Sequence, residues 1–152
     1  MTEAAPKPWP AMSIAEAHRI LTAPGMPFEM EELVIRGIPT RTWKNAPPTL
    51  RAVVEASRAH GEAIFLVNED ERVSFEAFYR AVAAFARTLQ AQGVRKGDRV
   101  ALIMRNLPEW PVAFYGAAAL GAILTPLNAW WTGPELEYGL TDSGAKVAIT
   151  DD

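Results

Sequence analysis

Three stretches in the carboxyl-terminal half decide the fold of this chain: GVRKGDRVALIMRNLPEW at residues 93–110, AAALGAILTPLN at 117–128 and TGPELEYGLTDSGAKVAITDD at 132–152. Each combines a short apolar run with turn residues or helix-start signals. The apolar runs are Arg99–Met104, Ala122–Pro126 and Lys146–Thr150. Short apolar runs bounded by turn residues are typical of buried strands, so we predict a strand in each. The first run, Arg99–Met104, is continuously apolar from Val100 to Ile103, which suits a strand covered on both faces.

Helical patterns separate these strands. The first helix follows Ser74 and ends at Gly93, with one stripe of apolar residues at steps of three and four: Phe75, Phe78, Val82, Phe85 and Leu89. We expect this stripe to pack on a sheet rather than bind a cofactor. Two further helices are predicted from about Pro108 to Leu120 and from Thr132 to about Thr141. With a strand at Ala63–Val67, they predict three successive strand–helix–strand units, which indicate an α/β fold with a mainly parallel sheet and right-handed crossovers.

The amino-terminal third has a different character. Residues 1–12 are rich in Pro and Ala and are predicted to form a flexible tail. Residues 13–48 form an extension with a helix at Ile14–Leu21 and a hairpin centred on Gly37. Residues 49–152 form the α/β segment, whose first helix is expected from Leu50 to about His60.

Composition excludes several classes of function. The chain has 152 residues, a net charge of −3 and no cysteine. It has no basic block, so we expect no nucleic-acid partner. Disulfides, thiolate catalysis and cysteine-based metal sites are ruled out. The amino terminus has prolines and a Trp where an export signal needs a long apolar stretch. The most apolar later stretch, Trp110–Leu127, is too interrupted by Pro and Gly for a transmembrane segment, and we expect a cytoplasmic protein.

Motifs of common catalytic sites are missing from the chain. GxGxxG, GxxxxGK[ST], HExxH and GxSxG do not occur. His18 and His60 fall in different predicted helices and lack the spacing of metal ligands. The acidic candidates resemble turn formers or a solvated terminal pair: Asp98, Asp142, Asp151 and Asp152. We therefore predict no catalytic residue and no metal ligand, and cofactor-binding residues stay unassigned. In open parallel sheets a site forms beyond the carboxyl ends of the strands, here after Met104, Pro126 and Thr150.

A set of short motifs carries a resemblance to a known family. The motifs are Val73-Ser74-Phe75-Glu76-Ala77-Phe78, Gly97-Asp98-Arg99-Val100-Ala101, Asn106-Leu107-Pro108-Glu109-Trp110, Leu120 to Asn128, and then Thr132, Glu135, Leu136, Asp142-Ser143-Gly144 and Lys146-Val147. Together they resemble the first part of the adenylate-forming (AMP-binding) enzymes, a superfamily that includes acyl-CoA synthetases. The pattern covers roughly residues 49–152. Phe75 and Phe78 depart from it, since the family usually has Tyr and Leu there.

The resemblance implies a parent ligase that uses ATP and Mg to convert a carboxylic acid to an acyl-adenylate and then forms the thioester with CoA. The sequence does not decide whether the acid activated by the parent enzyme is a fatty acid or an aryl acid. The family's phosphate loop, ribose-binding Asp and catalytic Lys lie beyond the stretch matched here, so the chain is expected to be an inactive, truncated amino-terminal portion that binds none of these cofactors tightly. Asn106, Pro126 and Asn128 are interpreted as turn and strand-end residues.

Two alternatives stay open at this stage. Either the chain is the amino-terminal portion of an acid–CoA ligase, or it is a stand-alone, non-catalytic binding or dimerisation module derived from that family. An uncovered apolar face would favour the first and would promote homo-oligomers. Trp130 and Trp131 are expected to pack internally rather than line a pocket.

Overall fold

The structure is a computed structural model that describes residues 11–151. The predicted tail at 1–12 lies outside the described residues except for its last two positions. The chain divides into two compact units, Met1–Pro48 and Thr49–Asp152. None of the helices found between residues 11 and 151 combines the length and apolar character that a bilayer-spanning helix requires.

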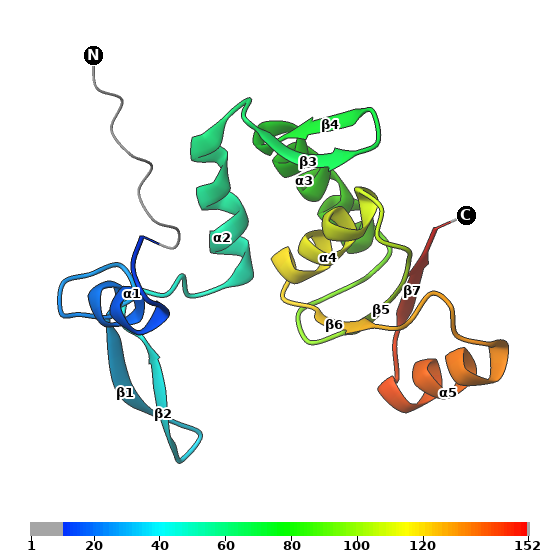
Figure 1. Cartoon of the computed structure of the whole chain (residues 1–152). Coiled ribbons are helices and arrows are strands. Elements are labelled where there is room, and N and C mark those ends of the chain that lie inside the picture. Colours follow the sequence, from blue (N-terminus) through cyan, green and yellow to red (C-terminus); the bar gives the residue numbers. More distant parts are fainter. Residues whose placement is uncertain (1–10, 152) are drawn as a thin grey trace. The chain divides into compact units, whose positions relative to one another are not determined.

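Residues 11–48 of the first unit contain one helix and one hairpin (Figure 1). Helix α1 (Ile14–Leu21) begins at Ser13, whose hydroxyl accepts the Glu16 N–H at 3.1 Å. Strands β1 (Met30–Ile35) and β2 (Ile38–Trp43) are antiparallel. Arg36 and Gly37 form the turn with positive φ values of 50° and 83°, as a tight two-residue hairpin requires. The helix and hairpin predicted here are confirmed.

The second unit contains four α-helices, α2 (Leu50–Ser57), α3 (Phe75–Ala91), α4 (Glu109–Ala119) and α5 (Gly133–Ser143). Three of these helices, α2, α3 and α5, begin after a residue with a side-chain hydroxyl. Thr49 and Ser74 accept backbone N–H groups, and Thr132 forms a capping box with Glu135. The helix predicted to reach His60 changes after Ser57 into a short 3₁₀ helix, η1 (Arg58–His60).

The strands of the second unit form two separate sheets. Strands β5 (Arg99–Ile103), β6 (Ile123–Pro126) and β7 (Val147–Thr150) form a parallel sheet in the order β6-β5-β7. Strand β3 (Ile64–Asn68) instead pairs antiparallel with β4 (Glu71–Ser74). The prediction of three successive parallel units is therefore wrong for the first. A tight turn lets β4 satisfy the backbone of β3 directly, so α3 connects a hairpin to the parallel sheet and is not a crossover between its strands.

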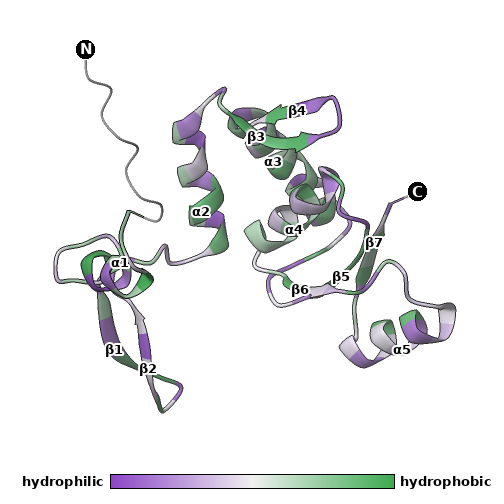
Figure 2. Cartoon of the chain, in the orientation of Figure 1, coloured by the Kyte–Doolittle hydropathy of each residue, from purple (hydrophilic) through white to green (hydrophobic). Residues whose placement is uncertain are grey.

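Helices α3 and α4 cover one face of the parallel sheet. One core cluster joins Leu89 of α3 and Ala117 of α4 to Val100 of β5, all at most 2% exposed. Phe78 and Val82 pack in a second cluster with Val54 of α2. The predicted packing role of the α3 stripe is confirmed. In Figure 2, β7 is coloured as hydrophobic along its length.

The opposite face of the sheet is less covered. Strand β5 is buried on both faces, as predicted, since Val100, Ala101 and Leu102 are each 0% exposed. On its neighbours, however, Ile123 is 53% exposed and Ala148 and Thr150 are also exposed. The register places Ala148 beside Ala101 and Thr150 beside Ile103, on one face. The second unit thus buries one side of its sheet under helices and leaves the flanking strands open on the other.

Candidate functional site

The carboxyl ends of the three parallel strands meet at one edge of the second unit. The residues that follow are Met104-Arg105-Asn106 after β5, Leu127-Asn128 after β6 and Asp151 after β7. The Leu127 N–H donates to the Leu102 carbonyl at 2.8 Å and extends the β5–β6 pairing by one step. The three segments in which a site was expected therefore lie together at this edge.

An ion pair links the ends of β5 and β7. The Asp151 carboxylate accepts the Arg105 Nε–H at 2.6 Å and the Arg105 backbone N–H at 3.2 Å. The Arg105 side chain holds the pKa of Asp151 below its usual range. Asp151 was expected to be a solvated terminal residue, and this expectation is wrong: its side chain is 17% exposed. Its partner lies 46 positions away, so no local sequence signal could have revealed the pair. Asp152 lies outside the described residues.

The loop after β6 is organised by Asn128. Its side-chain Oδ1 accepts the Trp130 N–H at 2.9 Å, and its carbonyl accepts the Trp131 N–H at 3.1 Å. Side-chain capping of this kind is typical of Asn in turns. Pro126 is the last residue of β6, and Asn106 lies between β5 and α4. All three residues lie where the turn and strand-end interpretation placed them.

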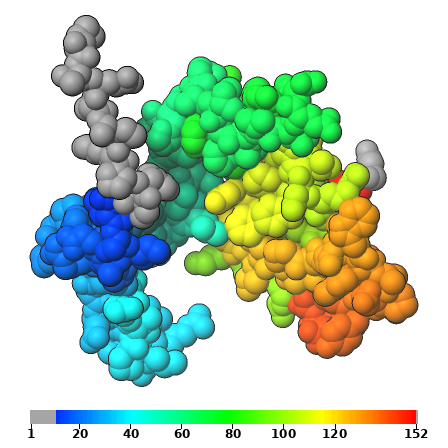
Figure 3. Space-filling view, in the orientation of Figure 1, coloured from blue at the N-terminus to red at the C-terminus, as the bar shows by residue number. Residues whose placement is uncertain are grey.

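The two tryptophans differ in environment. Trp130 is 82% exposed, so the prediction that it packs internally is wrong. Its backbone N–H donates to Asn128 Oδ1, a contact that holds the backbone of the loop and does not bury the ring. Trp131 is 38% exposed, and the close approach of its ring to Gly139 shows that it packs against α5. In the space-filling view, the orange segment that contains both residues lies at the surface (Figure 3).

Two cavities flank the end of β5. One, of about 480 Å³, extends toward β7 and is lined by residues that include Phe85, Glu109, Ile149 and Asp151. The other, of about 440 Å³, extends toward β6 and is lined by residues that include Asn106, Trp110, Asn128 and Trp130. Met104 and Arg105 border both. These volumes fall in the range of about 300–1,000 Å³ typical of small-molecule sites.

The remaining acidic and histidine candidates lie elsewhere. Asp98 precedes β5 at the opposite edge, where Lys146 Nζ and the Arg95 N–H donate to its carboxylate at 2.9 and 2.7 Å. Lys146, with the Arg95 N–H, lowers the pKa of Asp98. The prediction that Asp142 forms a turn is wrong. It lies in the last turn of α5, and Gly144 ends that helix with a φ of 61°.

His18 and His60 are both exposed, in α1 and η1. The His60 ring lies 4.6 Å from that of Phe75. Between residues 11 and 151, no three His, Asp or Glu side chains gather in a group that could hold a metal ion.

Comparison with known proteins shows where this fold belongs. The family model of the AMP-binding enzymes matches residues 53–152. This chain belongs to the AMP-binding enzyme family. A long-chain-fatty-acid–CoA ligase, FadD13 of Mycobacterium tuberculosis, is 40% identical over 102 residues, which are 67% of this chain and 18% of the relative. The long-chain-fatty-acid–CoA ligase of Salmonella typhimurium is 38% identical over 108 residues, 68% of this chain and 19% of the relative.

A solved structure supports the same family. The inhibitor-bound N-terminal domain of FACL13 from Mycobacterium tuberculosis superimposes with a TM-score of 0.64 at 34% identity, over 67% of this chain and 26% of that one. The resemblance to the amino-terminal portion of adenylate-forming enzymes is confirmed. The aligned segment spans about a fifth of the length of the curated relatives.

Proposed function

We propose that this chain forms the amino-terminal part of an AMP-forming carboxylic acid–CoA ligase. The whole enzyme would activate a fatty or aryl acid with ATP to an acyl-adenylate and transfer the acyl group to CoA in the cytoplasm. The observation that carries the proposal is the 40% identity to a long-chain-fatty-acid–CoA ligase over 102 residues. Residues 13–48 would be an extension and residues 49–152 the first segment of the AMP-binding domain.

The role proposed for this portion is structural. The carboxyl edge holds an ion pair, an Asn-capped turn and two cavities, but no nucleophile paired with a base in the described part of the chain. Gly93 and Gly97 lie before β5 rather than after it, so they do not form a phosphate cradle. These residues do not fit a site for ATP or Mg. We infer that none of them is catalytic and that the 152-residue chain binds ATP, CoA and Mg weakly when alone.

The exposed sheet face supports this proposal over the alternative of a stand-alone module. On that face Ile123 of β6 is 53% exposed. A domain selected to function alone normally covers such groups, whereas part of a larger sheet leaves them for later segments. The same apolar surface would promote self-association of the isolated chain.

Acid-dependent ATP–pyrophosphate exchange tests the proposal. The isolated chain should show no exchange with palmitate or benzoate. A chimera in which residues 49–152 replace the matching segment of the Mycobacterium tuberculosis ligase should show it with at least one of these acids. A folded chimera that is inactive with both acids would contradict the assignment to an acid–CoA ligase. Exchange by the isolated chain would contradict the inference that residues beyond this portion are required.

A further inference from the structure

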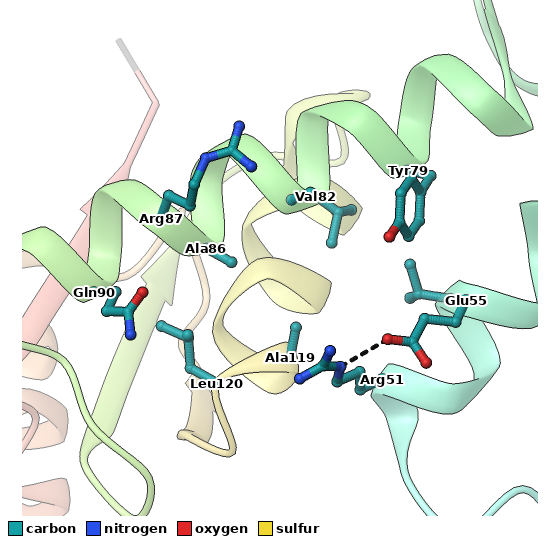
Figure 4. A pocket seen from close by; sticks show the side chains of 11 residues that line it. Arg51, Glu55, Tyr79, Val82, Ala86, Arg87, Gln90, Ala119 and Leu120 are labelled. Carbon is teal, nitrogen blue, oxygen red and sulfur yellow. Dashed lines mark hydrogen bonds and ion pairs between the residues drawn. The ribbon is translucent and has the colours of Figure 1, made fainter.

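A groove of about 290 Å³ lies between α2, α3 and α4 in the second unit (Figure 4). Its floor is apolar, since Val82 and Ala86 of α3 border it and are buried. At one end Arg51 pairs with Glu55 at 2.8 Å, so the two charges there are balanced. Arg87 is turned away from the apolar floor in Figure 4. The groove therefore contains no group that selects one class of ligand, and a more selective surface lies in the first unit.

That surface is the outer edge of strand β1. Strand β1 pairs only with β2, so its other edge is unpaired among residues 11–151. Residues 32–39 form the turn end of the hairpin and are all exposed, and this end extends away from α1 (Figure 1). Val34, near the turn, is 72% exposed. An exposed apolar edge strand is a template on which another strand can pair.

The hydrogen-bond pattern shows which backbone groups face this edge. The Lys44 N–H donates to the Glu29 carbonyl at 2.8 Å, where the two strands begin to pair. Bonded and non-bonded pairs alternate in an antiparallel ladder, so Glu32 and Val34 direct their N–H and C=O groups outward. The residue opposite Val34 is Pro39, which has no N–H to offer at the outer edge of β2. Near the turn, β1 can therefore pair with a further strand more fully than β2 can.

The sequence of this edge is complementary to itself. Residues 32–36 read Glu-Leu-Val-Ile-Arg, with an acidic residue, three apolar residues and a basic residue in order. When two such strands pair antiparallel about Val34, Glu32 of each copy lies across from Arg36 of the other, and Leu33 lies across from Ile35. An axis at Glu32 would instead place the two acidic residues opposite each other, which is unfavourable. An axis at Leu33 would leave each charge opposite an apolar residue. Only the axis at Val34 matches both charges and apolar groups.

Both of these charges are available for such a contact. The side chains of Glu32 and Arg36 make no ion pair or hydrogen bond among residues 11–151. Arg41 lies across from Glu32 within the hairpin, but no ion pair joins the two side chains. The edge thus lacks a cation opposite Glu32 and an anion opposite Arg36. A second copy of the same strand supplies both.

We propose that two copies of this chain associate by antiparallel pairing of their β1 edges about Val34, which joins the two hairpins into one sheet in the order β2-β1-β1-β2. A lone two-stranded hairpin is only marginally stable, and a sheet of four strands is more stable. Residues 32–36 of each copy form the contact, far fewer than the about 20–30 residues a side of a standard interface. We therefore expect a weak dimer whose population rises with protein concentration. The surface lies outside residues 53–152, which match the family, so the proposal is independent of the proposed ligase function.

Analytical ultracentrifugation of the 152-residue chain over a range of concentrations tests the proposal. The unchanged chain should show a reversible monomer–dimer equilibrium. Val34→Pro removes an outward N–H but no bond to β2, because proline is tolerated at such edge positions, and it should abolish the dimer. Arg41→Pro makes the same change on the outer edge of β2 and should leave the dimer intact. A chain that stays monomeric throughout, or equal effects of the two proline variants, would overturn the proposal.

A further control separates this surface from the open face of the parallel sheet. Ile123→Glu places a charge on that face and should leave the dimer intact. If Ile123→Glu abolishes the dimer and Val34→Pro does not, association occurs through the sheet face. The pairing of β1 edges would then be refuted, whereas the proposed ligase function would stand.

Exchange of the two charges tests the register. Glu32→Arg and Arg36→Glu each place like charges opposite each other in a homodimer and should weaken it about tenfold. In an equimolar mixture of the two variants, opposite charges meet again at both ends, so native mass spectrometry should detect mainly the heterodimer. Each change is present in both kinds of dimer, so its effect within the hairpin cancels. A statistical mixture of dimers would overturn the register, and this comparison decides if circular dichroism shows that Val34→Pro does not fold.

Discussion

Gly116 of α4 lies close to Phe85 and Ala86 of α3, and this contact predicts the effect of adding a side chain at Gly116. A Cβ atom at Gly116 would lie 2.9 Å from Phe85 Cδ1 and 3.4 Å from the Ala86 nitrogen. Carbon atoms in contact are normally about 3.5–4.0 Å apart, so the Phe85 ring must move by roughly 0.6 Å or more. That ring packs against two core clusters and cannot move freely.

We therefore expect Gly116→Ala to destabilise the chain. Overpacking of a core contact costs about 1–3 kcal/mol, and we expect the upper part of that range here because the Phe85 ring is held by packing on several sides. Replacing Gly by Ala in a helix gains about 1 kcal/mol. The net loss in the free energy of unfolding is about 1–2 kcal/mol, measured by urea denaturation followed by circular dichroism. Gly133→Ala in the first turn of α5 is the control, because no atom lies within 4 Å of its Cβ position, and it should not destabilise.

A double mutant tests the cause of that loss. If the Phe85 ring is the obstacle, Phe85→Leu together with Gly116→Ala should cost less than the sum of the two single changes. Additive costs would show that the ring is not responsible. A Gly116→Ala variant as stable as Gly133→Ala would refute the reasoning from close contact altogether.

Three further predictions concern the second unit. Leu89→Ala should lower the free energy of unfolding, measured by urea denaturation, by about 2–5 kcal/mol, because Leu89 is only 2% exposed. Its control, Leu50→Ala, changes a position that is 45% exposed and should cost less. Ser74→Ala should cost about 1 kcal/mol by the same assay, because the Ser74 hydroxyl accepts the Ala77 N–H at the start of α3. The lowered pKa of Asp98 means that its interaction with Lys146 stabilises the fold above the ordinary carboxyl pKa and is lost as pH falls below about 4. Thermal melts of Asp98→Asn should accordingly lose less stability than wild type over that acid range, and an identical pH profile would contradict this role.

Local signals predicted most element boundaries correctly. Ser13, Thr49, Ser74 and Thr132 were each expected at a helix start, and each begins a helix. A cap involves groups only two or three positions apart, so the sequence contains the whole interaction. The turn predicted at Asn128 was likewise correct, because its side chain accepts a hydrogen bond from a residue only two positions away.

Long-range features were not predictable in the same way. The sequence indicated that Ala63–Val67 is a strand, but not that its partner is the next strand along the chain rather than β5. The exposure of Trp130 also depends on which way the loop after β6 turns relative to α5. Both properties depend on contacts between segments that are far apart in the sequence, and these contacts form only in the folded chain.

By itself the sequence determined the α/β class, the starts of the helices and the family, because periodicity, caps and motifs are local patterns. Only the tertiary structure decided the strand order β6-β5-β7, the ion pair between Arg105 and Asp151, and the groove between α2, α3 and α4. Each of these depends on side chains brought together across many intervening residues. Their geometry is therefore a property of packing, and no short stretch of the chain encodes it.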